Sequence, residues 1–153
     1  NMDCPEVRAG NTIYLPVNVP GAYLFFGDAH LVMGDGEIIG YGVEAAVNVE
    51  LKVDLIKGRK IGWPRIENDE YLMTLGMYRP LEDAFRIATK DMVLWIAEDY
   101  GLDMMDSYQL VSQVMKAEVS QMVDPNYTIL VKFPKKYLPE QKPVFGGMHD
   151  RLK

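Results

Sequence analysis

Residues 45–55, AAVNVELKVDL, alternate between apolar and polar side chains over most of their length. The apolar positions are Val47, Val49, Leu51, Val53 and Leu55, and the polar positions between them are Asn48, Glu50, Lys52 and Asp54. Because successive side chains of a strand point to opposite faces, this pattern predicts a strand with one face on a core and one in solvent. A period of two over this length favours an antiparallel sheet.

The residues that precede this stretch carry further strand and turn signals. Ile13, Leu15 and Val17 alternate with polar or turn-forming neighbours, and Pro20-Gly21 is a turn dipeptide. The runs AYLFFG at 22–27 and EIIGYGVE at 37–44 follow, separated by a glycine-rich turn. Four short strands within residues 11–55 predict a β-sandwich-like portion that covers residues 1–69.

The middle of the chain changes to a helical period. Pro80 precedes a stretch whose apolar residues recur every three or four positions, and Gly101 is a helix-ending signal. Asp103 is a good N-cap for a second helix, which we expect to end near Glu118. The run YTILVKF at 127–133 predicts a closing strand. Residues 70–133 therefore form an α+β excursion, and the predicted fold class is α+β with an antiparallel β-sandwich-like core.

The last segment, residues 134–153, differs in composition from the rest. It contains three prolines and five basic residues against two acidic ones, which gives it a net charge of +3. Prolines and a charge excess are typical of chain ends that form little structure, so we predict an extended basic tail. His149, in this tail, is predicted to be exposed to solvent.

Length and charge limit the possible functions. The chain has 153 residues with 22 acidic and 16 basic side chains, a net charge of -6, and 48% hydrophobic residues. This length suits one domain with a sizeable core. No window approaches the roughly 18 uninterrupted apolar residues of a membrane span, and the acidic balance disfavours nucleic acid. The single cysteine, Cys4, excludes an intramolecular disulfide and favours a reducing, cytoplasmic location.

The polar residues suited to metal binding or catalysis are concentrated in GDAHLVMGDGE, residues 27–37, and in Glu44. Asp28 and His30 share a face in an extended segment, and the glycines between them and Glu37 allow a turn that brings Asp35 and Glu37 back beside them. Glu44 has the wrong parity for this face in a straight strand, and a bulge at Gly40 or Gly42 would correct it.

Imidazole and carboxylates together suit zinc, manganese or a similar divalent ion, and a carboxylate subset suits calcium. Such an ion lowers the pKa of a bound water, which is useful in hydrolysis. The alternative is that Gly-Asp-Gly-Glu is a solvated β-turn without a ligand, because these residues are common in hairpins. Cys4 has no histidine near it in the sequence, which disfavours a nucleophilic role.

These motifs resemble the acetamidase/formamidase family. The similar segments are NMD at 1–3, LPVNVPGA at 15–22, GDAHLVMGDGE at 27–37, IIGYGVE at 38–44, YLMTLG at 71–76 and VSQMVDP at 119–125. Two positions depart from the family pattern, Met33 where glutamine is frequent and Ile39 where cysteine is frequent. Because Asn1-Met2-Asp3 resembles a mid-chain motif, the resemblance implies a C-terminal half whose partner is the N-terminal half of the same enzyme.

The resemblance further implies a cytoplasmic homo-oligomer with a β-sandwich core that hydrolyses formamide or acetamide to ammonia and the carboxylate. As a hypothesis, Asp28, His30 and Glu37 bind a divalent metal, zinc or calcium, and Glu44 or Asp35 acts as general base on the bound water. Asp3, in the other polar motif, is a candidate substrate-binding residue. Two alternatives from other classes are a calcium-dependent carbohydrate-binding β-sandwich and a non-catalytic structural subunit. Ammonia release distinguishes the enzyme from both.

Overall fold

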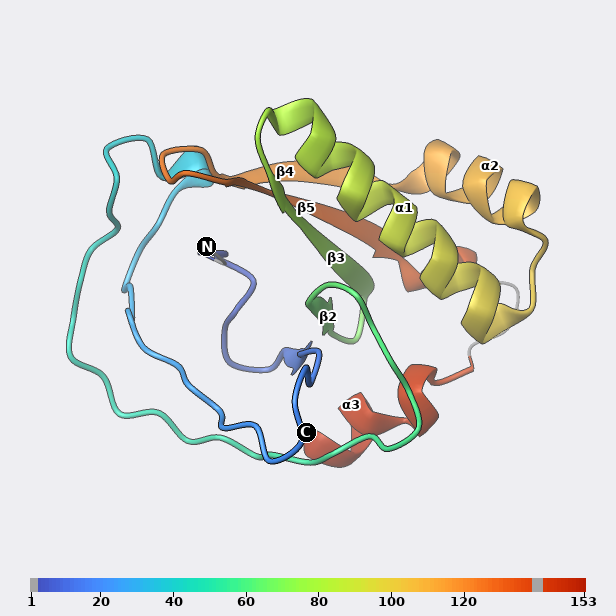
Figure 1. Ribbon diagram of the computed structural model, residues 1–153, viewed down its shortest axis with the longest axis horizontal. Coiled ribbons are helices and arrows are strands. Elements are labelled where there is room, and N and C mark those ends of the chain that lie inside the picture. Colours follow the sequence, from blue (N-terminus) through green and yellow to red (C-terminus); the bar gives the residue numbers. More distant parts are fainter. Residues whose placement is uncertain (1–2, 139–141) are drawn as a thin grey trace.

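The computed structural model describes residues 3–138 and 142–153, and these contain one five-stranded antiparallel sheet in the order β1-β2-β3-β5-β4 (Figure 1). The strands are β1 (Thr12–Tyr14), β2 (Arg65–Glu67), β3 (Tyr71–Tyr78), β4 (Lys116–Gln121) and β5 (Tyr127–Pro134). The longest pairing joins β3 to β5, from Tyr71 opposite Pro134 to Tyr78 opposite Tyr127. The predicted strand at 127–133 is therefore confirmed, and it occupies the interior of the sheet.

Helix α1 (Leu81–Tyr100) packs along one face of this sheet, as Figure 1 shows. Its residues Ala84, Ala88, Met92 and Trp95 are fully buried, at the three- and four-residue steps that place side chains on one helix face. Gly76 of β3 allows a very close approach, since a Cβ there would lie 2.0 Å from the backbone oxygen of Ala84. The helix and the strand therefore touch through their backbones.

Helix α2 (Met104–Val114) begins as the sequence predicts and ends earlier. The Asp103 side chain accepts a hydrogen bond from the backbone N–H of Met105 at 2.8 Å, which caps the helix. Met115 already has an extended backbone, with ψ at 155°, and the chain continues as β4. The expected end near Glu118 was wrong because pairing with β5 holds residues 116–121 in a strand.

The face of the sheet opposite the helices carries a smaller core of Cys4, Ile66, Met73, Leu75 and Leu130. Burial raises the pKa of the Cys4 thiol, with a hydrogen bond involving Ser120 opposing the increase. A buried thiol with a raised pKa is a poor nucleophile, which agrees with the sequence analysis. The sheet with helices on one face and this cluster on the other confirms the α+β class.

The predicted β-sandwich-like layer does not form within the described residues. Of the four strands expected between residues 11 and 55, the structure contains β1, and the chain from 15 to 64 runs as a wide loop that leaves the sheet and returns to β2 (Figure 1). The five large apolar residues of 45–55 are between 46% and 70% exposed: Val47, Val49, Leu51, Val53 and Leu55. The period-two pattern identifies a face that suits burial, but it supplies no neighbouring strand to pair with.

The C-terminal segment is folded where the sequence predicted an extended tail. It contains the 3-10 turns η2 (Lys135–Tyr137) and η3 (Val144–Gly146) and the short helix α3 (Met148–Leu152). Leu138, Val144 and Met148 join the main core, and the ring of Phe145 lies 4.3 Å from that of Tyr14. These apolar residues anchor the segment despite its charge. Pro139 and Glu140 lie outside the described residues.

His149 is buried, not exposed, with 3% of its surface accessible. Its Nδ1 lies 2.9 Å from Thr12 Oγ1 and its Nε2 lies 3.3 Å from Asp69 Oδ1, so it joins α3 to the β1 end of the sheet. The prediction failed because both partners are far away in the sequence. As to membranes, none of the helices in the described parts of the chain has the length and apolar character needed to span one.

Candidate functional site

The loop from Asp28 to Glu44 folds back on itself, so that its two arms run antiparallel. His30 and Glu44 form an isolated β-bridge, flanked by hydrogen bonds from Leu31 N–H to Val43 O and from Val43 N–H to Val32 O, both 2.8 Å. The reversal passes through the 3-10 turn η1 (Asp35–Glu37). This chain reversal, rather than the bulge that the sequence suggested, places Glu44 beside His30.

The first group of candidate ligands consists of Asp28, His30 and Glu44, whose ligand atoms lie within 4.8 Å of one another. His30 Nε2 is 2.9 Å from Glu44 Oε1 and 3.5 Å from Asp28 Oδ1. This nitrogen is buried, yet the directions of these contacts do not satisfy a hydrogen bond. Buried polar groups in proteins are normally hydrogen-bonded, so this nitrogen calls for a partner such as an ion or a water molecule.

Gly42 provides the space that the imidazole of His30 occupies. A Cβ at Gly42 would lie 2.8 Å from both His30 Cγ and His30 Nδ1, and 2.9 Å from the backbone oxygen of Val32. The backbone of Gly42 does not have a positive φ, so the requirement is one of space and not of conformation. The glycine between the two arms therefore determines where the histidine side chain lies.

The second group consists of Asp3, Glu37 and Asp124, which also come within 4.8 Å of one another. Gly36 has a φ of 81° and accepts a hydrogen bond from Met122 N–H at 3.0 Å, which holds η1 against the β4–β5 connection (Figure 1). The left-handed backbone at Gly36 suits glycine. The group thus combines three segments that are far apart in the sequence.

Gln121, which is fully buried, organises the connection that carries Asp124. Its Oε1 accepts hydrogen bonds from the backbone N–H groups of Val123 and Asp124, and its Nε2 donates to the backbone oxygen of Asn126 at 2.7 Å. A side-chain amide that satisfies several backbone groups of a turn fixes the conformation of that turn. Gln121 is therefore a positioning residue for Asp124.

Glu37 is a buried carboxyl group whose pKa is raised by its surroundings. It is 6% exposed, and burial raises its pKa. The negative charges of Asp3, Asp124 and Asp28 raise the pKa further, whereas His30 lowers it. His30 and Asp28 act electrostatically on Glu37, so the two groups of candidate residues are neighbours in the structure.

The structure thus groups the predicted residues differently from the sequence hypothesis. Asp28 and His30 come together as expected, but Glu44, expected as a base, is their neighbour, and Glu37, expected as a ligand, belongs with Asp3. Asp35 is exposed and belongs to neither group among the described residues. Sequence reasoning missed Asp124 and Gln121, although both lie in VSQMVDP, a segment already quoted for its family resemblance.

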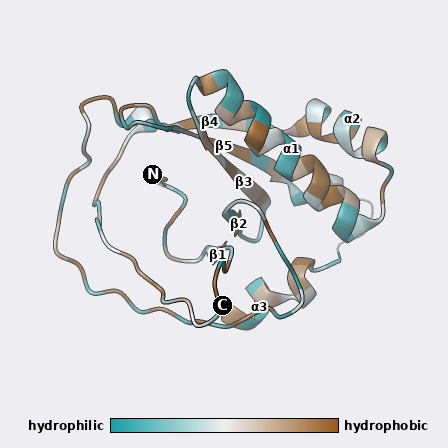
Figure 2. Cartoon of the chain, in the orientation of Figure 1, coloured by the Kyte–Doolittle hydropathy of each residue, from teal (hydrophilic) through white to brown (hydrophobic). Residues whose placement is uncertain are grey.

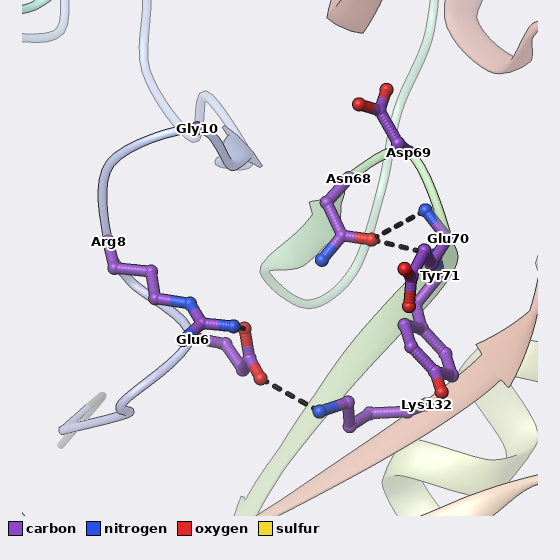
Figure 3. A pocket seen from close by; sticks show the side chains of 8 residues that line it. All are labelled: Glu6, Arg8, Gly10, Asn68, Asp69, Glu70, Tyr71 and Lys132. Atoms are coloured by element: carbon purple, nitrogen blue, oxygen red, sulfur yellow. Dashed lines mark hydrogen bonds and ion pairs between the residues drawn. The ribbon is translucent and has the colours of Figure 1, made fainter.

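A shallow pocket of about 300 Å³ lies elsewhere, between the N-terminal segment and the start of β3 (Figure 3). None of the predicted site residues lines it. Three of its charged side chains pair with one another, since Glu6 contacts Arg8 at 3.1 Å and Lys132 at 2.8 Å. Asn68 Oδ1 accepts hydrogen bonds from two backbone N–H groups at the rim. These paired groups stabilise the fold, and we do not place the functional site in this pocket.

Comparison with known proteins assigns this chain to a family. The model of the acetamidase/formamidase family matches residues 1–138. A solved acetamidase from Yersinia enterocolitica is 48% identical with a TM-score of 0.89, and one from Bacillus halodurans is 35% identical with a TM-score of 0.78. Each match covers 92% of this chain, but 42% and 48% of the respective structures. An acetamidase of Mycolicibacterium smegmatis is 44% identical over 59 residues, 38% of this chain and 14% of that protein. This chain therefore spans less than half the length of these relatives, and it belongs to the acetamidase/formamidase family.

Proposed function

We propose that this chain is part of an enzyme that hydrolyses short aliphatic amides, such as formamide and acetamide, to ammonia and the carboxylate with the help of a divalent metal. Family membership supports the reaction class. The observation that carries the metal is His30 Nε2, a buried nitrogen with no hydrogen bond that faces the carboxylates of Asp28 and Glu44. A solvated turn without a ligand does not explain why this nitrogen is buried without a hydrogen bond.

The spacing of the three residues fits a common cation. Two ligands that each lie about 2.1 Å from zinc, at angles between about 90° and 109°, are about 3.0 to 3.4 Å apart. The distances from His30 Nε2, 2.9 Å to Glu44 and 3.5 Å to Asp28, are close to these limits. An imidazole ligand favours zinc or a similar transition metal over calcium, which prefers oxygen. We therefore propose zinc for the group of Asp28, His30 and Glu44.

A divalent ion held there would supply Lewis acidity, which lowers the pKa of water and stabilises the charge that develops on the amide oxygen. We assign the proton transfers to Glu37. It is buried, and its raised pKa brings the carboxyl closer to neutral pH, where a group both accepts and donates protons efficiently. Glu37 takes a proton from the attacking water and passes it to the departing amine. Asp35 is exposed and outside both groups, which makes it less suited to this role.

Asp3 and Asp124 are proposed to orient the substrate and to maintain the raised pKa of Glu37. Asp3 and Asp124 lie within reach of Glu37, and carboxylates accept hydrogen bonds from an amide –NH2 group. Because the chain spans less than half of the solved acetamidases, we propose that the complete site also needs the N-terminal half of the enzyme. Assembly as a cytoplasmic homo-oligomer, which the family resemblance implies, is part of the same proposal.

Metal content tests the ligand assignment directly. We expect elemental analysis of the purified chain to find about one zinc ion per chain, and Glu44→Gln to weaken zinc binding at least about 10-fold. Glu98→Gln is the matched control, because Glu98 is an exposed carboxylate on α1, outside the site. A chain that binds no divalent metal, or one in which both variants bind alike, would contradict the assignment.

Activity tests the reaction class. We expect ammonia release from formamide or acetamide when this chain is combined with the part of the Yersinia enterocolitica acetamidase that it does not match. Glu37→Gln should lower kcat at least about 100-fold with a smaller effect on KM, because the lost group transfers protons and does not bind the substrate. Saturable sugar binding without ammonia release would instead support the carbohydrate-binding alternative.

A further inference from the structure

Strand β4 contains a β-bulge at Ser120. Val119 lies opposite Ile129 and Gln121 lies opposite Thr128, so Ser120 is one extra residue of β4 between two consecutive residues of β5. This end of the sheet lies beside η1 and away from α3 (Figure 2). Bulges are frequent next to active sites, where they redirect a side chain. The bulge therefore lies where it could place parts of the candidate site.

The side chain of Ser120 contacts the N-terminal segment. Ser120 is 2% exposed, and its Oγ donates a hydrogen bond to the backbone oxygen of Asp3 at 2.5 Å. Its hydroxyl also contacts the thiol of Cys4. Because the carboxylate of Asp3 belongs to the same residue as the carbonyl group that is held, this hydrogen bond fixes the position from which the carboxylate extends.

The two residues that follow hold the other segments that carry site carboxylates. Gln121 Oε1 accepts a hydrogen bond from the backbone N–H of Asp124 at 3.2 Å. Met122 N–H donates to the backbone oxygen of Gly36 at 3.0 Å, one residue before Glu37. Three consecutive residues, each through one hydrogen bond, thus hold the three segments of the second group of candidate residues.

A group of three carboxylates needs such restraint. The ligand atoms of Asp3, Glu37 and Asp124 lie within 4.8 Å of one another, and like charges at this separation repel. We propose that Ser120 is a positioning residue, whose hydrogen bond keeps the carboxylate of Asp3 beside those of Glu37 and Asp124. Ser120 acts through Asp3 and transfers no proton itself. The inference rests on the proposed role of Asp3 in orienting the substrate.

Thiol labelling tests the hydrogen bond on the chain alone. Cys4 is the only cysteine of the sequence and is 8% exposed, so labelling requires the N-terminal segment to open. Ser120→Ala should speed the labelling of Cys4 at least about 5-fold, because it removes the hydrogen bond to Asp3. The lost hydroxyl contact would by itself raise the pKa of the thiol and slow the reaction, so faster labelling reports opening.

Ser107→Ala is the matched control for this measurement. Ser107 is a fully buried serine on α2, and its Oγ makes no hydrogen bond within the described residues. Both variants therefore remove one buried hydroxyl, but only Ser120→Ala removes a contact to the site. Cys4 in the control should be labelled at the rate of the unchanged chain. Each variant should keep a cooperative thermal unfolding transition, which shows that any faster labelling is local.

The pKa of Glu37 separates a positioning role from a merely structural one. The negative charge of Asp3 raises this pKa, so a carboxylate that moves away should let it fall toward the ordinary value of 4.5. Carbon-13 NMR titration of the metal-free chain measures it, with Glu37→Gln to assign the signal. We expect the pKa to fall in Ser120→Ala and not in Ser107→Ala. Asp3→Asn should lower it too, without faster labelling of Cys4.

Two results would overturn the proposal. One is labelling of Ser120→Ala that is no faster than labelling of Ser107→Ala, because the hydrogen bond would then hold nothing. The other is faster labelling with an unchanged pKa of Glu37, because Ser120 would then stabilise the backbone without placing the carboxylate of Asp3. Neither measurement needs ammonia release, so a failure to hydrolyse amides would contradict only the proposed function.

Discussion

The position of the His30 imidazole depends on the absence of a side chain at Gly42. We predict that Gly42→Ala lowers zinc affinity at least about 10-fold, because the new Cβ would lie 2.8 Å from the ring and force it aside. Gly27→Ala is the control in the same loop, as a Cβ at Gly27 meets nothing within 4 Å. Zinc titration of both variants checks this, and equal affinities would contradict it.

The raised pKa of Glu37 predicts a pH-dependent stability. A carboxyl whose pKa is higher in the folded state than its ordinary value of 4.5 favours folding in its protonated form, and this contribution is lost as the pH rises through the folded pKa. Glu37→Gln keeps the neutral form at every pH. In metal-free protein, the variant should therefore gain stability relative to the unchanged chain between pH 4 and pH 7. Urea unfolding at both pH values measures this, and a constant difference would argue against it.

Part of the site could be recognised from single residues and part could not. Asp28 and His30 were predicted as neighbours because a separation of two places both on one face of an extended segment. Asp124 was not, because no local pattern tells which turn will contact η1. The different grouping of Glu37 and Glu44 has the same origin, since it depends on how the loop reverses between them.

At the scale of secondary-structure elements, the contact between α1 and β3 depends on Gly76. We predict that Gly76→Ala destabilises the fold by about 3 kcal/mol or more, because the new Cβ would lie 2.0 Å from the backbone oxygen of Ala84 in α1. A backbone atom cannot relieve this clash by a change of rotamer, so the whole helix would have to shift. Gly62→Ala, where a Cβ meets nothing within 4 Å, should have little effect. Urea unfolding of both variants tests the prediction. An equally small effect at Gly76 would show that the helix can move away.

Strand β2 and helix α1 are joined by a buried ion pair. Arg65 Nε and Nη2 donate to the two carboxylate oxygens of Asp91, each at 2.8 Å, and both residues are at most 6% exposed. Asp91→Ala should cost about 3 to 5 kcal/mol, because it leaves the guanidinium buried without its partner. The double variant Arg65→Met with Asp91→Leu should recover much of this loss. Denaturant unfolding checks both, and a double variant as unstable as Asp91→Ala would rule out the ion-pair explanation.

At the scale of the whole molecule, stability is predicted to be uneven. The β3 and β5 strands lie in the sheet interior under α1, whereas residues 46–55 have no backbone pairing to the other described segments. Hydrogen exchange of the isolated chain should therefore show the slowest amides in β3 and β5, and nearly unprotected amides in 46–55. Strong protection of residues 46–55 in the isolated monomer would contradict this and would mean that this segment pairs with the rest of the chain.

The sequence by itself determined the helix α1 and its end at Gly101, the cap of α2 at Asp103, the strand β5 and the α+β class. These features depend on hydrogen bonds and periodicities contained within a few residues, so local patterns predict them. Only the tertiary structure decided that residues 15–64 form an open loop, that His149 is buried against Thr12, and that Glu44 lies beside His30. A strand or a site needs partners that are distant in the sequence, and the alternation in 45–55 indicates a face suited to burial without naming the surface that covers it.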